Sequence, residues 1–101
     1  MKIYVVITDF REDGLFVEAA YSNRKRAVVL ATKAYFSPSN RNHCYNELVE
    51  VYDTKTGDNE ETIDIEELVK NGRFGSSTKT RARDFSIVAQ ILQEQKKEEK
   101  Q

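Results

Sequence analysis

The stretch KIYVVITDFREDGLFVEAAY, residues 2–21, carries the pattern that decides the fold. Its first part, residues 2–8, consists mainly of β-branched and aromatic residues, which favour strands. The polar residues 11–14 follow, and Gly14 suits a turn position with a positive φ angle. Residues 15–21 then alternate between two faces, as a second strand would. The stretch therefore predicts a β-hairpin.

The rest of the chain predicts a helix, a second hairpin and two further helices. Ser22 is a good N-cap for a helix over residues 23–36, and Pro38 prevents its continuation. Asp64 and Glu67 have the spacing of a capping box, with Gly72 as the helix stop. The other expected elements are a strand over 44–52, a turn over 53–59, a strand over 61–65, a helix over 65–71, a Gly/Ser/Thr-rich connection over 73–80 and a last helix that starts between Thr80 and Asp84. The order ββα-ββ-αα predicts an α+β fold with an antiparallel sheet of about four strands, helix 1 on one face and the C-terminal helix or a second chain on the other.

The first strand is apolar on both of its faces. Ile3, Val5 and Ile7 point to one face, whereas Tyr4 and Val6 point to the other. We expect the helix over 23–36 to pack on the face with Ile3, Val5 and Ile7. The Tyr4/Val6 face then needs a cover of its own, either the C-terminal helix or a second copy of the chain in a homodimer.

Length and composition indicate one soluble domain over residues 1–101, with 94–101 as a frayed tail. The chain is 39% hydrophobic and 33% charged, which is too apolar for a disordered segment. Its longest apolar runs, Tyr4–Ile7 and Ala27–Ala31, fall far short of the roughly 20 residues of a membrane span. The start lacks the pattern of a signal peptide, so we expect a cytoplasmic protein without a membrane partner.

No sequence motif predicts catalysis or a metal or cofactor site. His43 and Cys44 are neighbours whose side chains diverge in an extended segment, and two ligands are too few for structural zinc. The segment GSSTKT, residues 75–80, lacks the P-loop glycines, because Arg73 and Thr78 occupy those positions. An enzyme would need residues distant in sequence to meet in a pocket. We therefore expect a protein that is not an enzyme.

The charges separate into two adjacent blocks of opposite sign. Residues 53–67 contain seven acids and one base, and residues 70–83 contain five bases and no acid. One interpretation is that the blocks partly neutralise each other; the other is that one of them binds a charged partner. The candidate partner-binding residues are Asp58, Glu60, Glu61, Glu66 and Glu67 in the acidic patch, and Lys70, Arg73, Phe74, Lys79, Arg81 and Arg83 in the basic segment.

These blocks lead to two functional hypotheses. In the first, the acidic patch enters a basic groove of another protein and takes the place of nucleic acid there. In the second, the basic segment 70–83 grips nucleic-acid phosphates, which would make binding sensitive to salt. The net charge of −1 fits the first hypothesis better.

The segment KIYVVITDFREDGLFVEAAYSNRKRAVVLA, at the start of the chain, resembles a recurrent type of small phage and prophage protein. Such proteins open with a Lys-x-Tyr-Val-Val strand and a hairpin, followed by a Ser-capped, Ala-rich helix. The resemblance covers residues 2–52 and gives no position a functional role. It implies an interaction protein that inhibits or modulates a host protein, such as a CRISPR-type defence nuclease.

Overall fold

The computed structural model describes the backbone of residues 1–37, 45–75 and 79–99, and their side chains apart from those of 71–75, 79–82 and 95–99. The described strands form one antiparallel sheet in the order β2-β1-β3-β4. The elements are β1 (Lys2–Asp9), the short 3-10 helix η1 (Arg11–Asp13), β2 (Leu15–Tyr21), α1 (Arg24–Tyr35), β3 (Asn46–Asp53), β4 (Asn59–Asp64), α3 (Ile65–Gly75) and α4 (Lys79–Glu99). The predicted α+β fold with a four-stranded antiparallel sheet is confirmed.

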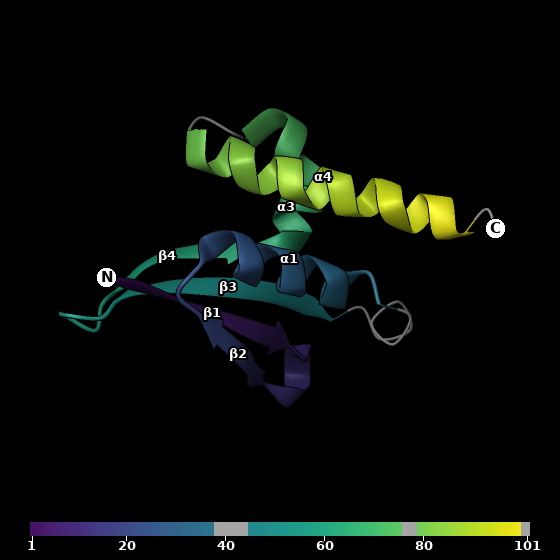
Figure 1. The fold of residues 1–101 in the computed structure, drawn as a ribbon. Coiled ribbons are helices and arrows are strands. Elements are labelled where there is room, and N and C mark those ends of the chain that lie inside the picture. Colours follow the sequence, from purple (N-terminus) through teal and green to yellow (C-terminus); the bar gives the residue numbers. More distant parts are fainter. Residues whose placement is uncertain (38–44, 76–78, 100–101) are drawn as a thin grey trace.

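Helices α1, α3 and α4 all lie on one side of the sheet (Figure 1). Helix α1 packs against β1, β2 and β3, α3 packs against β3, and α4 packs against α1 and α3. The core lies between these two layers. Its buried members are Val6, Ala27, Val28, Ala31, Val49, Val51, Ile63, Ile65, Leu68 and Val88.

The structure reverses the predicted use of the two sheet faces. Val6 is fully buried in the core beside α1, so the Tyr4/Val6 face is covered within the chain and is not a homodimer interface. The prediction that α4 covers a second face is also wrong, because α4 lies over α1. The physical reason lies in the neighbouring strand. Val6 pairs with Val49, whereas Val5 on the other face pairs with Glu50.

A register shift in β2 changes which of its residues share a face. Val6 pairs with Ala19, but Ile7 pairs with Val17, so Glu18 is an extra residue in β2. The predicted strict alternation over residues 15–21 therefore fails at Glu18. The side chain of Glu18 lies on the helix-covered face, where it meets Thr8 of β1.

Several element boundaries differ from the predictions. Asn23 rather than Ser22 caps α1, since its side chain accepts a hydrogen bond from the backbone N–H of Arg26 at 3.0 Å. Helix α3 continues past Gly72 to Gly75, because its packing against α4 outweighs the local stop signal. Helix α4 runs from Lys79 to Glu99, so its backbone stays helical beyond Glu94, where a frayed tail was expected.

Other local predictions are confirmed. Asp64 accepts a hydrogen bond from the backbone N–H of Glu67 at 3.0 Å, as the capping-box spacing predicts for the start of α3. Gly14 adopts a φ angle of 95°, which is the positive value expected for the turn between β1 and β2. Within the described part of the chain, none of the helices has the length and hydropathy to cross a bilayer.

Candidate functional site

The acidic residues predicted to bind a partner are placed on the edge strand β4 and at the start of α3. Glu60 and Glu61 belong to β4, Glu66 and Glu67 lie in the first turn of α3, and Asp58 is exposed in the turn before β4. Acidic side chains in a first helical turn are stabilised by the helix dipole. The positions of Glu66 and Glu67 are therefore explained by the stability of the helix, and they do not by themselves indicate a binding partner.

Ion pairs within the chain take up three of these carboxylates. The Glu60 Oε2 atom lies 3.1 Å from Lys2 Nζ, the Glu61 Oε1 atom 2.8 Å from Arg24 Nη2, and the Glu66 Oε2 atom 3.1 Å from Arg11 Nη2. Hydrogen bonds from Arg24 and Arg11 lower the pKa of Glu61 and of Glu66, respectively. The acidic patch is therefore largely neutralised by cations from the N-terminal part of the sequence.

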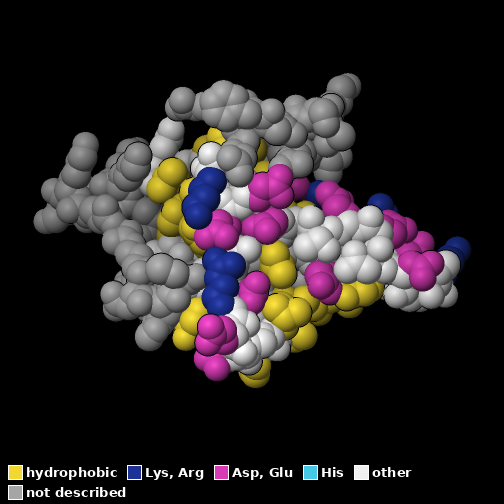
Figure 2. Space-filling view, turned by 180° about the vertical axis from the view of Figure 1, so that it is seen from behind, with side chains coloured by type: hydrophobic (Ala, Val, Ile, Leu, Met, Phe, Trp, Pro, Cys, Tyr) yellow, Lys and Arg dark blue, Asp and Glu magenta, His cyan; other side chains and the backbone are white. Residues whose placement is uncertain are grey.

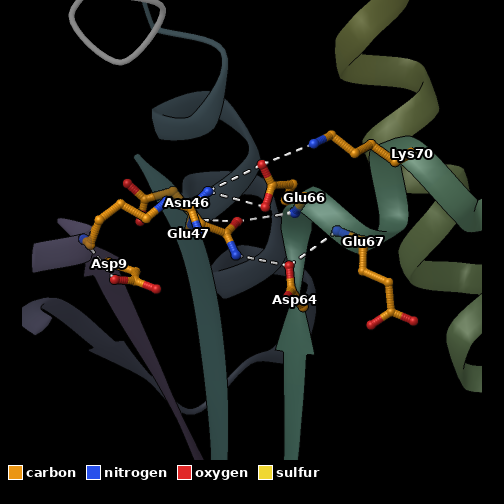
Figure 3. A network of polar contacts seen from close by, with 8 residues as sticks. Asp9, Asn46, Glu47, Asp64, Glu66, Glu67 and Lys70 are labelled. Carbon is orange, nitrogen blue, oxygen red and sulfur yellow. Dashed lines mark hydrogen bonds and ion pairs between the residues drawn. The ribbon is translucent and has the colours of Figure 1, made fainter. Parts of the chain in front are cut away.

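The N-terminus of α3 is held in a polar network at the start of β3 (Figure 3). The buried Asn46 donates to Asp64 at 2.9 Å and accepts from the backbone N–H groups of Glu47 and Glu66, at 2.7 Å and 3.1 Å. Lys70 adds an ion pair to Glu66 at 3.2 Å. Because the backbone donors at this helix end are satisfied by side chains of the chain itself, the network fixes α3 to the sheet.

Arg24 joins three elements. Its guanidinium donates two hydrogen bonds to Glu61 of β4, at 2.8 Å and 2.9 Å, and two to Asp84 of α4, at 2.7 Å and 3.1 Å. Asp84 is only 3% exposed, so its pairing with Arg24 supplies the counter-charge that a buried carboxylate requires. These hydrogen bonds raise the pKa of Arg24. The role of Arg24 is structural.

The basic segment is described in part. Lys70 pairs with Glu66 one turn earlier in α3, and Arg83 is exposed on α4. The side chains of Arg73, Phe74, Lys79 and Arg81 lie outside the described residues. Nucleic-acid binding by residues 70–83 stays a prediction. His43 and Cys44 also lie outside the described residues.

We call the sheet face opposite the helices the open face. The side chains that the strand register places there are apolar, acidic or, as with Asn46 and Thr62, neutral and polar, and Ile7 and Asn46 among them are buried. Leu15 and Val17 of β2 are 62% and 61% exposed, and the adjoining Ile3 and Tyr52 are half-buried. Viewed from behind, hydrophobic, acidic and basic side chains lie next to one another (Figure 2). The apolar members of the open face are Ile3, Val5, Ile7, Leu15, Val17, Ala20, Leu48 and Tyr52, and its acids are Asp9, Glu50 and Asp64.

A cavity of about 320 Å³ opens on the helix-covered side, at the end of the sheet where β1 and β2 turn. It contains Thr8, Glu18 and Glu47 together with the aromatic residues Phe10 and Tyr45. Sequence analysis missed this cavity. The signal was present in β3, where Glu47 precedes Val49 and Val51 at alternate positions and therefore shares their inward-facing side.

Glu47 is the most perturbed carboxylate in this cavity. It is 3% exposed, and burial raises its pKa to about 7, opposed in part by the hydrogen bonds from Thr8 and reinforced by the nearby Glu18. Within the described residues, no group of three or more His, Cys, Asp or Glu side chains is arranged to hold a metal ion.

Comparison of the sequence with protein-family models and with curated proteins, and of the fold with solved structures, finds no match. The open face and the cavity around Glu47 are two candidate binding surfaces among the described residues.

Proposed function

We propose that this chain is a non-catalytic protein-binding protein, and that its open face docks on the surface of another protein. The observation that carries the proposal is the exposure of Leu15 and Val17, which are 62% and 61% exposed on the open face of the edge strand β2. Exposed apolar side chains that adjoin one another are typical of interaction sites. In the described part of the chain, the helices leave this side of the sheet uncovered.

The two edges of the sheet support this choice of surface. The β4 edge has the sequence NEETID, whose charged side chains disfavour association with another protein strand or apolar surface. The β2 edge has the sequence LFVEAAY, with a single charged residue. The apolar edge and the open face are continuous through Leu15 and Val17, which share a face with Ile7 and Leu48.

Charge defines the chemistry of the partner. The charged side chains that the described strands place on the open face are Asp9, Glu50 and Asp64, all of them acids. An apolar surface with basic residues would complement them. A second copy of this chain would instead place its own acids opposite Glu50 and the other acids, and these like charges would repel one another. The partner is therefore a different protein with a basic, partly apolar surface.

The resemblance of residues 2–52 to small phage proteins supports a partner in a host cell. Of the acidic patch, Asp58 lies exposed in the turn before β4, while Glu60, Glu61 and Glu66 are paired with cations of the chain. Acids such as the exposed Asp58 and those of the open face attract the basic surface of a protein that binds nucleic acid. A host nuclease of the CRISPR type is such a protein, and inhibition or modulation of it is the activity that the resemblance of residues 2–52 supports.

Affinity purification from a bacterial lysate tests the proposal. The bait carries either the native sequence, Val17→Lys on the open face, or Gln93→Lys as a control on the exposed side of α4. A specific protein recovered by the native chain and by Gln93→Lys, but lost with Val17→Lys, would support it. Equal recovery by Val17→Lys, or a nucleic acid as the sole bound molecule, would contradict it.

A further inference from the structure

In the cavity at the end of the sheet, one threonine hydroxyl lies between two carboxylates. The Thr8 Oγ1 atom lies 2.8 Å and 3.0 Å from the two carboxylate oxygens of Glu47, and 3.0 Å from Glu18 Oε1. A threonine hydroxyl has one proton, so it donates to one carboxylate at a time. With both glutamates ionised, the cluster carries two negative charges, and the Thr8 hydroxyl donates to only one of them.

Burial makes the negative charge of Glu47 costly. Glu47 is 3% exposed, whereas Glu18 is exposed, so Glu47 forms the floor of the cavity and Glu18 its mouth. Neither carboxylate has an ion-pair partner among the described residues, in contrast to the equally buried Asp84, which Arg24 neutralises. An unpaired buried carboxylate favours any cation that fits beside it.

The walls indicate which cation fits. Phe10 and Tyr45 meet edge to face, with ring centroids 4.6 Å apart, and both border the cavity. Aromatic rings attract cations, and aliphatic side chains such as Leu30 and Ala34 of α1 accommodate an alkyl chain. The volume of about 320 Å³ lies at the lower end of the range for small-ligand sites, about 300–1,000 Å³.

We propose that this cavity binds the head of a linear alkylammonium ion, which donates hydrogen bonds to Glu18 and Glu47 while its carbon chain lies against Leu30 and Ala34. The ammonium can belong to a free amine or to a lysine side chain of a protein. Binding at this site is independent of the open face, because the cavity lies on the helix-covered side of the sheet.

A proton competes with this cation. The pKa of Glu47 is about 7, so the ammonium displaces a proton below that pH, and its affinity rises with pH until Glu47 is ionised. The titratable side chains that border the cavity are Glu18 from β2, Tyr45 before β3 and Glu47 itself, while the lining residues from α1 are uncharged.

The experiment is an NMR titration of the full chain with n-butylammonium, with n-butanol as the neutral analogue. Saturable shifts at Thr8 and Glu47 with n-butylammonium, and none with n-butanol, are expected. Glu47→Gln should weaken binding at least about tenfold, while Glu50→Gln, which alters a carboxylate on the opposite face of β3, should leave it unchanged. Lowering the pH of the native chain by one unit below about 7 should weaken binding up to about tenfold, which tests the site without any variant.

A second arm uses N-acetyl-lysine methylamide to identify the source of the ammonium. Binding at least as tight as that of n-butylammonium supports a lysine side chain, and weaker binding supports a free amine. The proposal is overturned if n-butanol binds as well as n-butylammonium, if Glu47→Gln folds and binds equally, if Ca²⁺ saturates the site in place of the amine, or if no shift occurs.

Discussion

Glu47 places an ionisable group in the interior of a domain whose other inward-facing β3 side chains include Val49 and Val51. Its pKa rises from 4.5 to about 7 because burial penalises the charged form. The folded state therefore holds a proton over a pH range in which the unfolded state has released it. The contribution of Glu47 to the free energy of unfolding is fully present below about pH 4.5 and is lost as the pH rises through about 7.

Replacement of Glu47 by Gln should remove this pH dependence. The free energy of unfolding of Glu47→Gln relative to the native chain should increase between about pH 5 and about pH 8, by up to about 3 kcal/mol. Urea denaturation at both pH values measures the difference. The exposed Glu18→Gln serves as a control, and an equal difference at the two pH values for Glu47→Gln would contradict the assignment.

The cap of α1 provides a second test at the residue scale. Asn23 accepts the hydrogen bond from the Arg26 N–H, although the sequence favoured Ser22 in that role. Asn23→Ala should therefore destabilise the fold by about 1 kcal/mol, and Ser22→Ala should change it by less than about 0.5 kcal/mol. Thermal unfolding of the two variants measures both losses of stability. A larger loss in Ser22→Ala than in Asn23→Ala would identify Ser22 as the cap.

Residue types alone could not distinguish these two caps. Serine and asparagine are about equally favoured at the N-cap position, so the residue types do not show whether Ser22 or Asn23 caps α1. Asp64 was predictable because its partner Glu67 stands at the capping-box spacing. Glu47 was missed because its burial depends on which face of the sheet the helices cover, and this is not a property of the residue.

At the scale of elements, Arg24 connects α1, β4 and α4 through Glu61 and Asp84. Arg24→Met should cost about 3 kcal/mol, because it leaves the buried Asp84 carboxylate without its counter-charge. Adding Asp84→Asn to that variant should recover part of the loss, since the uncompensated charge is then gone. Urea denaturation of the single and double variants measures both effects.

The exposed pair Lys2–Glu60 is the matched control for this prediction. Its lysine side chain is 55% exposed, so Lys2→Met should leave stability almost unchanged. Equal effects of Arg24→Met and Lys2→Met would show that Asp84 does not depend on Arg24.

The strands and helices themselves were largely predictable, but the face of the sheet that α1 covers was not. In β1 alone, Ile3, Val5 and Ile7 make one face more apolar than Tyr4 and Val6. The register across strands decides otherwise, because Val6 lies beside Val49, which in turn lies beside Ile63. A single strand does not reveal which residues its neighbours place on the same face, so pairing information was needed.

At the scale of the whole molecule, the charge blocks of the sequence are distributed over several contacts. Glu60, Glu61 and Glu66 pair with Lys2, Arg24 and Arg11, and Lys70 of the basic segment also reaches Glu66. The sequence showed the charges but could not show these partners, which lie 37 to 58 positions away for the first three acids. Among the described residues, the exposed side chains that these pairs do not involve include Leu15 and Val17 of the open face.

This charge distribution predicts the oligomeric state. Because both copies would present the same acids, the isolated chain should sediment as a monomer of 11.7 kDa at neutral pH. Sedimentation velocity over a range of concentrations gives the mass directly. A mass near twice that value, reduced to one copy by Val17→Lys, would identify a second copy as the occupant of the open face.

Amide hydrogen exchange of the chain, alone and in complex with the protein that it recovers from a host lysate, tests the role of the open face most directly. The account predicts that complex formation slows exchange at residues 15–21 of β2 and leaves residues 88–94 of α4 unchanged. Unchanged exchange in β2, with new protection confined to the acidic residues 58–67 or to the helices, would contradict it.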